Sequence, residues 1–119
     1  MRFLRKLKKF RNQFIIKKVR KIVLPHFDED QVVRYTCLIT GHVQHRGLRL
    51  ELDHLAHRLK LTGYIKNKPQ GEIELEVQGP ENKVLFLLDS MLKVKRVTIK
   101  SHQREAIDID LKETTFELI

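Results

Sequence analysis

The chain has 119 residues, of which 41% are apolar and 33% are charged, and its formal net charge is +9. This length and balance are ordinary for one globular domain with a single modest core. Its one cysteine, Cys37, lies in an apolar stretch, which excludes a disulfide framework and indicates a small buried side chain in a strand.

Residues 1–22 form a basic arm, MRFLRKLKKFRNQFIIKKVRKI, with ten Lys or Arg and no acid. The other 97 residues carry 14 basic and 15 acidic side chains, so the positive charge belongs to the arm. Apolar residues recur on one side of a predicted helix: Phe3, Leu7, Phe10 and Phe14. Arg11 and Lys18 interrupt the apolar stripe as it continues.

Three interpretations of the arm remain open. Its apolar runs are too short to span a membrane, and no apolar core or cleavage site of a secretory signal follows the charges. As a structural element, the helix packs its Phe stripe on the body or on a second subunit. As a functional element, residues 1–22 bind an anionic membrane surface or, less favoured, nucleic acid. We expect a cytoplasmic protein, peripheral to the membrane if the arm binds lipid.

A domain boundary is predicted near residue 31. Pro25 closes the arm, and residues 26–31 (HFDEDQ) read as an acidic turn without an apolar period. We therefore divide the chain into an arm and linker, 1–31, and a folded domain, 32–119.

The folded domain alternates strand and helix patterns. Residues 33–41 are rich in β-branched and aromatic side chains, and residues 71–79 alternate strictly between apolar and acidic. A helix is predicted from the apolar stripe that runs from Leu48 to Leu59. The other expected elements are strands at 61–67 and 94–100, a helix that starts near Pro80, and a short terminal strand at 115–119.

The order strand, helix, strand, strand, helix, strand predicts an α+β fold of the ferredoxin-like, split βαβ type. We expect a four- to five-stranded antiparallel sheet with two helices on one face, plus the N-terminal basic helix. Because many functions share this fold, the function must be argued from a site.

The loop GHVQHRGLR, residues 41–49, is a candidate anion site. It leads from a strand into a helix, where unpaired backbone N–H groups and the helix dipole attract negative charge. Gly41 and Gly47 allow tight bending, and Arg49 can reach a phosphoryl group from the first helical turn. The alternative is a polar corner in which Arg49 only caps the loop. Asn67 ends the next strand, and in this fold it can converge with the loop.

The sequence here resembles the acylphosphatase family. The resemblance rests on Gly41-x-Val43-Gln44-x-x-Gly47-x-Arg49, then LTGYI-x-N from Leu61 to Asn67, and VQGP at 77–80. It covers about residues 33–99 and implies a small, metal-free enzyme that hydrolyses the carboxyl-phosphate bond of small-molecule acyl phosphates.

The resemblance also implies site residues. Arg49 matches the phosphate-binding arginine, and Asn67 matches the asparagine that orients the attacking water. The implied phosphate-binding loop comprises Val43, Gln44, His45, Arg46, Gly47 and Leu48. No cofactor is expected. No metal site is expected either, because His54 and His57 have no identifiable third ligand.

Three loop residues depart from the family pattern, of which Leu48, in place of the usual Phe, is a conservative change. The family usually has Gly-Val where this chain has His45-Arg46. A glycine in a phosphate-binding loop commonly allows a backbone conformation with positive φ, so His45 is expected to strain the loop. Conversely, positive charge on His45 and Arg46 would favour anion binding. These departures leave one alternative open, a catalytically weak or inactive phosphate-binding module.

Overall fold

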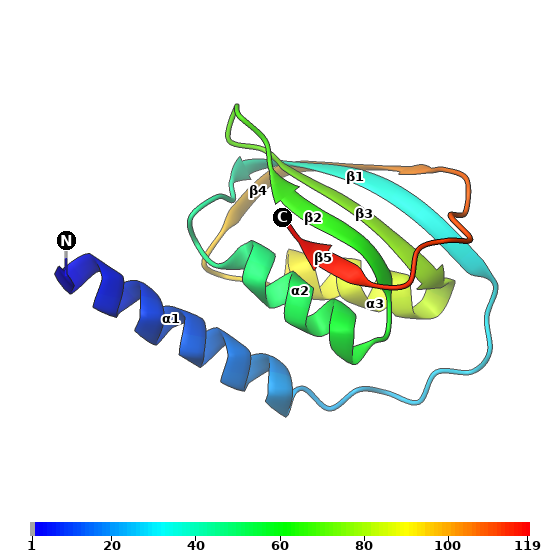
Figure 1. Cartoon of the computed structure of the whole chain (residues 1–119), viewed down its shortest axis with the longest axis horizontal. Helices are drawn as coiled ribbons and strands as arrows, with labels where there is room; N and C mark the ends of the chain where they lie inside the picture. Colours follow the sequence, from blue (N-terminus) through cyan, green and yellow to red (C-terminus); the bar gives the residue numbers. More distant parts are fainter. Residues whose placement is uncertain (1) are drawn as a thin grey trace.

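The computed structural model describes residues 2–119. Its elements, in chain order, are α1 (Arg2–Lys21), β1 (Val32–His42), α2 (Leu48–Arg58), β2 (Thr62–Asn67), β3 (Ile73–Pro80), α3 (Glu81–Leu92), β4 (Thr98–Ala106) and β5 (Phe116–Leu118). Helices α2 and α3 lie on one face of the sheet, and α1 runs alongside α2 on the outside (Figure 1). The predicted ferredoxin-like fold with an additional N-terminal helix is confirmed.

The strands form one five-stranded mixed sheet in the order β4-β1-β3-β2-β5. The first four strands are antiparallel to their neighbours, as predicted, whereas β5 joins the edge of β2 in a parallel orientation. The strand predicted at 94–100 is displaced: it runs from Thr98 to Ala106. Val94 and Val97 are buried in the preceding turn, and the polar residues 101–105 are held by pairing with β1.

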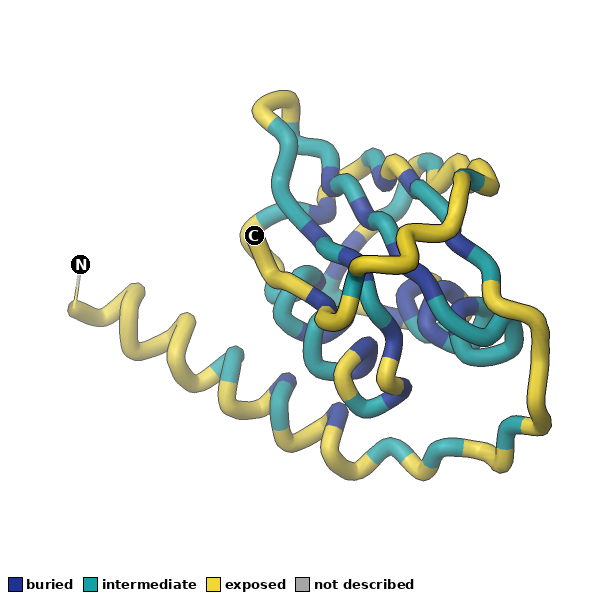
Figure 2. Tube along the Cα trace, turned by 45° about the vertical axis from the view of Figure 1, so that its right-hand side comes forward, coloured by how far each residue is buried: buried dark blue, intermediate teal, exposed yellow. Residues whose placement is uncertain are grey.

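The core lies between the sheet and helices α2 and α3 (Figure 2). In β3 the apolar residues Ile73, Leu75 and Val77 are fully buried, and the acidic residues between them face outward, as the strict alternation predicts. Cys37 is buried and unpaired in β1, also as expected.

Helix α1 joins this core through its second half. Ile15 and Val19 are buried, and each such side chain contributes about 1.5–3 kcal/mol of hydrophobic stabilisation. Arg58 of α2 donates to the carbonyl oxygen of Val19 at 2.7 Å and thereby caps the last turn of α1. Lys18, which interrupts the apolar stripe, pairs with Glu51 of α2 at 3.4 Å.

The first half of α1 extends beyond the body and is exposed (Figures 1 and 2). The aromatic stripe does not pack on the domain: Phe3, Phe10 and Phe14 are 70%, 74% and 66% exposed. The stripe therefore does not pack on the body, because it lies on a different side of the helix from Ile15 and Val19. Packing on a second subunit, the other half of the structural interpretation, stays a prediction. No helix among residues 2–119 is long and apolar enough to cross a membrane.

Candidate functional site

The strand register brings the 43–48 loop and Asn67 to the same end of the sheet. Strands β1 and β2 both pair antiparallel with β3, so they run in the same direction. Ile39 of β1 lies opposite Ile73 of β3, and Ile73 in turn lies opposite Asn67 of β2. Two strand spacings of about 4.8 Å therefore separate Asn67 at the end of β2 from Ile39, three residues before the end of β1 and the start of the loop.

Two residues of the loop between β1 and α2 have left-handed backbone conformations, with positive φ. Gly47 has φ 79° and precedes the first turn of α2, and no side chain caps that helix. His45 has φ 61°, a conformation that a glycine adopts without cost and a histidine does not. The expectation of strain at this position is borne out by the backbone.

The backbone N–H groups of residues 44–49 make no well-formed hydrogen bond to any described residue. They stand at the N-terminus of α2, where the helix dipole adds positive potential. Such a set of free donors is the arrangement that binds phosphate in many proteins.

Two arginines hold the carbonyl groups of this loop from outside it. Arg11 of α1 donates from Nη1 to the carbonyl oxygen of His45 at 2.9 Å. Arg96, just before β4, donates from Nε to the carbonyl oxygen of Arg46 at 3.0 Å. All peptide bonds are trans, so in each of these peptides the following N–H points away from the arginine. Two consecutive peptide planes of the loop are thus fixed by side chains.

Gln44 ties the loop to the turn after Asn67. Its Nε2 donates to the carbonyl oxygens of Lys68 at 2.7 Å and Glu72 at 2.8 Å. This side chain therefore acts as a bridge between the two halves of the site. The same bridge sets the position of Asn67, which adjoins Lys68, relative to the loop.

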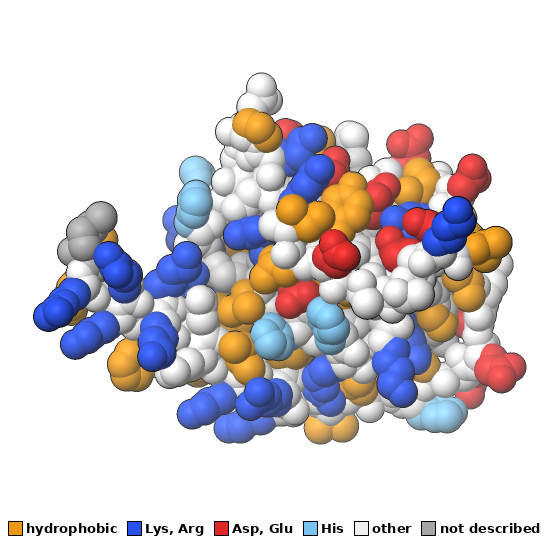
Figure 3. All heavy atoms as spheres, viewed as in Figure 1, with side chains coloured by type: hydrophobic (Ala, Val, Ile, Leu, Met, Phe, Trp, Pro, Cys, Tyr) orange, Lys and Arg blue, Asp and Glu red, His pale blue; other side chains and the backbone are white. Residues whose placement is uncertain are grey.

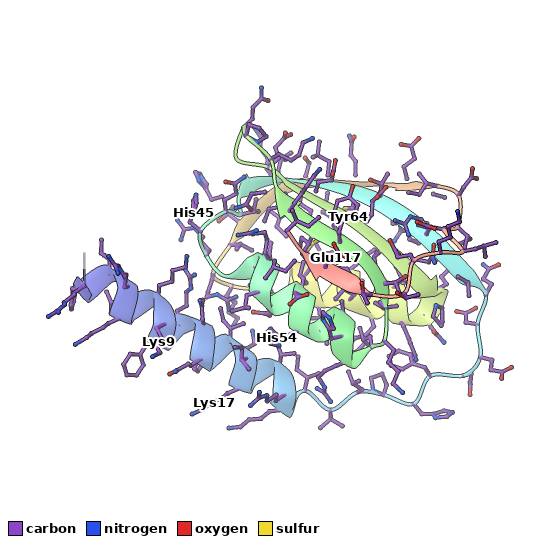
Figure 4. The ribbon with its side chains drawn as sticks, in the orientation of Figure 1. Lys9, Lys17, His45, His54, Tyr64 and Glu117 are labelled. Atoms are coloured by element: carbon purple, nitrogen blue, oxygen red, sulfur yellow. The ribbon has the colours of Figure 1, made fainter. Side chains whose placement is uncertain are left out.

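A cavity of about 480 Å³ opens at this end of the molecule. Arg49 and Asn67 both line it, together with His45 and Gly47 of the loop. Helix α1 contributes the rest of one wall, through Leu4, Leu7, Lys8, Arg11 and Asn12. Figure 4 shows His45 on the loop that faces the N-terminal half of α1, and the space-filling view shows a notch there with Lys and Arg side chains beside it (Figure 3).

The two principal side chains are held differently. Arg49 donates from Nη1 to the carbonyl oxygen of Ile119, which leaves its other donors available. The Oδ1 atom of Asn67 is buried and accepts no hydrogen bond from any described residue. A buried acceptor without a hydrogen-bond partner costs folding free energy.

The electrostatics of the cavity are positive. Its lining includes Lys8, Arg11 and Arg49, and no acidic residue among those described lines it. Glu51, the nearest buried acid of α2, is instead paired with Arg96 at 2.6 Å and with Lys18 at 3.4 Å. The cavity is therefore suited to an anion.

The predicted site residues have different positions in the structure. Arg49, Asn67, His45 and Gly47 line the cavity, whereas Val43 and Leu48 are buried beneath the loop. Arg46 is exposed and contributes its carbonyl group to Arg96. His57 pairs with Asp53 on α2, and no group of three potential metal ligands occurs within residues 2–119.

Sequence reasoning missed Arg11 and Arg96 as residues of the site. Arg11 left one signal, since it interrupts the apolar stripe of the arm. Arg96 left none, because its contact to Arg46 is 50 residues away along the chain.

Comparisons with known proteins agree with this geometry. The acylphosphatase family model matches residues 35–118. The chain is 40% identical over 62 residues to an acylphosphatase of Clostridium beijerinckii, which covers 52% of this chain and 69% of the relative. It is 36% identical over 69 residues to an acylphosphatase of Pediococcus pentosaceus, over 52% of this chain and 77% of the relative.

Solved structures show the same fold. The acylphosphatase of Bacillus subtilis superposes with a TM-score of 0.68 at 22% identity, over 73% of this chain and 98% of that one. A full-length HypF structure in the phosphate- and nucleotide-bound form superposes with a TM-score of 0.69 at 20% identity, over 79% of this chain and 12% of that one. At these identities the likeness concerns the fold alone.

Proposed function

The chain belongs to the acylphosphatase family of acid anhydride hydrolases, and from this premise we propose that the cavity lined by Arg49 and Asn67 is where it hydrolyses acyl phosphates. Relatives of this family act on small-molecule acyl phosphates. The observation that carries the assignment is that Arg49 and Asn67 line one cavity, beside the loop whose backbone N–H groups make no well-formed hydrogen bond to any described residue.

In this proposal, the loop from Val43 to Leu48 holds the phosphoryl group with its free N–H donors. Arg49 adds a charged, planar donor, which suits the bidentate geometry of phosphoryl oxygens. Its bond to the carbonyl of Ile119 leaves enough donors for that role. The positive end of α2 stabilises the charge that develops on the phosphoryl oxygens.

Asn67 is proposed to orient the attacking water. A carboxamide oxygen accepts one O–H of the water, which directs an oxygen lone pair at phosphorus in line with the leaving group. The bond from water oxygen to phosphorus forms as the bond from phosphorus to the carboxylate oxygen breaks. The products are a carboxylate, inorganic phosphate and one proton. A carboxylate leaves readily as an anion, so the reaction needs no strong general acid.

The experiment is hydrolysis of benzoyl phosphate by the full chain with a metal chelator present. We expect the enzyme to turn over without added metal, since the loop, Arg49 and Asn67 suffice for positioning and charge neutralisation. Loss of all activity in the chelator, with recovery on adding a divalent metal, would contradict the assignment. Phosphate binding without turnover would favour an inactive phosphate-binding module.

A second function is suggested by the exposed stripe of α1: attachment to an anionic membrane surface. With about 100° of rotation per residue, Phe3, Phe10 and Phe14 fall within a narrow sector of the helix. They are 66% to 74% exposed, and the segment 1–22 carries ten cationic side chains. Aromatic side chains beside a cationic face suit the interface of an anionic bilayer.

This proposal is tested by vesicle co-sedimentation with the full chain, because Ile15 and Val19 belong to the core and deleting the arm would expose it. A variant with Phe3, Phe10 and Phe14 all changed to Ser keeps every charge. We expect wild type to bind vesicles that contain phosphatidylglycerol, and the variant to bind them much more weakly. Equal binding by both, or binding of an oligonucleotide but not of vesicles, would refute membrane attachment through this stripe.

A further inference from the structure

We propose that helix α1 is part of the hydrolytic site and that Arg11 is the residue that positions the phosphate-binding loop. This inference rests on the proposed function, because it concerns the same cavity. The family model begins at residue 35, so α1 (Arg2–Lys21) lies outside the matched region. The contribution of α1 would therefore be a property of this chain that its family match does not contain.

The first support is the bond from Arg11 to the loop. The Nη1 atom of Arg11 lies 2.9 Å from the carbonyl oxygen of His45. Because the 45–46 peptide is trans, its N–H points to the side opposite Arg11. Holding the carbonyl therefore fixes the direction of the Arg46 N–H, one of the loop donors that the proposed function assigns to the phosphoryl group.

The second support is that the peptide held by Arg11 is the one that most needs holding. His45 has φ 61°, a conformation that is unfavourable for a non-glycine residue. The charge-assisted hydrogen bond from Arg11 to the His45 carbonyl oxygen counters that cost. Arg11 is itself oriented by Asn12, whose Oδ1 accepts from Nη2 at 3.2 Å.

The third support is direct packing of α1 on the loop. A Cβ atom on Gly47 would lie 2.4 Å from Cδ1 of Ile15 and 3.3 Å from Nε of Arg11. Gly47 thus lies directly against side chains of α1, and its positive φ favours glycine. Since Ile15 is fully buried, the helix cannot move away from the loop without exposing core.

The fourth support is charge. Arg11 forms no ion pair with any acidic residue of the described chain, and it lines the cavity. Its positive charge is therefore directed at whatever anion occupies the site. Arg11 does not have to touch the phosphoryl group for this effect, so we describe it as a positioning residue.

The experiment compares four variants of the full chain with wild type: Arg11→Met, Arg11→Gln, Arg11→Lys and, as a control, Lys17→Met. Met keeps an unbranched apolar stem and removes both the charge and the donor, whereas Gln keeps a donor and Lys keeps both. Lys17 is exposed on the same helix and lies away from the cavity (Figure 4). The measurements are the Kd of inorganic phosphate by calorimetry, kcat and KM for benzoyl phosphate, and the thermal unfolding midpoint.

We expect Arg11→Met to weaken phosphate binding about tenfold and to lower kcat, with partial recovery in Arg11→Gln and fuller recovery in Arg11→Lys. Lys17→Met should match wild type in every measurement. If Arg11→Met binds phosphate and turns over like wild type, or if all its losses disappear at a temperature where both proteins are fully folded, the inference is wrong while the proposed function stands. If wild type itself neither binds phosphate nor hydrolyses benzoyl phosphate, the proposed function has failed instead.

Discussion

Arg49, in the first turn of α2, and Asn67, the last residue of β2, line the same cavity. They share no element, and they meet because β1 and β2 run in parallel on either side of β3. One side chain offers charged donors, and the other offers an unpartnered acceptor. In the proposed function Arg49 donates hydrogen bonds to the phosphoryl group and Asn67 accepts one from water. The two residues therefore carry separate expectations.

Arg49→Lys tests whether a planar donor is needed. Lysine keeps the charge but loses the fork of donors, so we expect kcat/KM for benzoyl phosphate to fall by about 100-fold. The Kd of inorganic phosphate should rise in parallel. A variant that retained wild-type kinetics would indicate that the only role of Arg49 is its hydrogen bond to the carbonyl oxygen of Ile119.

Asn67→Ala tests whether the Asn67 amide orients the attacking water. We expect kcat to fall roughly 100-fold while the Kd of inorganic phosphate changes little, because the amide contacts the water rather than the phosphoryl group. In water enriched with oxygen-18, hydrolysis by wild type and the residual hydrolysis by Asn67→Ala should both place the label in phosphate. Label in the benzoate would mean attack at the carbonyl carbon and would refute this role.

His45→Gly and His45→Ala test the strain at φ 61°. Both remove the imidazole, but only glycine adopts this φ at no cost, so the Gly variant should be the more stable of the two by about 1 kcal/mol. We also expect its activity to equal or exceed that of wild type. A sharp loss in both variants would show that the imidazole takes part in the site.

Lys8→Met tests discrimination between substrates. Lys8 lines the cavity from α1 and has no ion-pair partner within residues 2–119. We therefore expect wild type to prefer 4-carboxybenzoyl phosphate over benzoyl phosphate in kcat/KM, since the added carboxylate can meet this charge. The preference should disappear in Lys8→Met. Equal selectivity in the two proteins would place the acyl group away from α1.

Glu74→Gln tests a pH-dependent contribution to stability. The hydrogen bond from Tyr64, at 2.8 Å, lowers the pKa of the Glu74 carboxyl, with further lowering by Lys66 and Lys68. A carboxyl whose folded pKa is lowered stabilises the fold above its ordinary pKa of about 4.3, and this contribution is lost as pH falls through the folded value.

The Gln variant should therefore lose roughly 1 kcal/mol of unfolding free energy at pH 7 and much less at pH 3. Urea unfolding at both values measures the difference. Glu72→Gln is the matched control, because Glu72 lies in the turn before β3 and has no ion-pair partner in the described chain. A loss that is equal at both pH values would exclude a charged contribution from Glu74.

Local patterns were sufficient to predict most of the fold. The alternation around Leu75 and the stripe that begins at Leu48 each identify an element by its period, because burial of one face imposes that period. The strand β4 was misplaced because it is an exposed edge strand, in which pairing with β1 replaces apolar alternation. Its sequence from Ser101 onward carries almost no signal of burial.

The site was predictable where it follows from chain-local chemistry and not where it depends on tertiary contacts. Arg49 stands next to its loop in the sequence, so the local pattern makes it a candidate, and the family resemblance implies its role. The contact of Arg11 with His45 joins residues 34 positions apart, and no local pattern encodes it. The division of the chain near residue 31 stays a prediction, although Ile15 and Val19 share the core of the folded domain.

The most direct test of the account is the rate of benzoyl phosphate hydrolysis, in the presence of a metal chelator, by wild type, Arg49→Ala and Asn67→Ala. Their thermal unfolding midpoints are measured alongside, so that a loss of folding is recognised. We predict metal-independent turnover by wild type and a loss of about 100-fold or more in each variant at an unchanged midpoint. Turnover by both folded variants at the wild-type rate would contradict the assignment of the site.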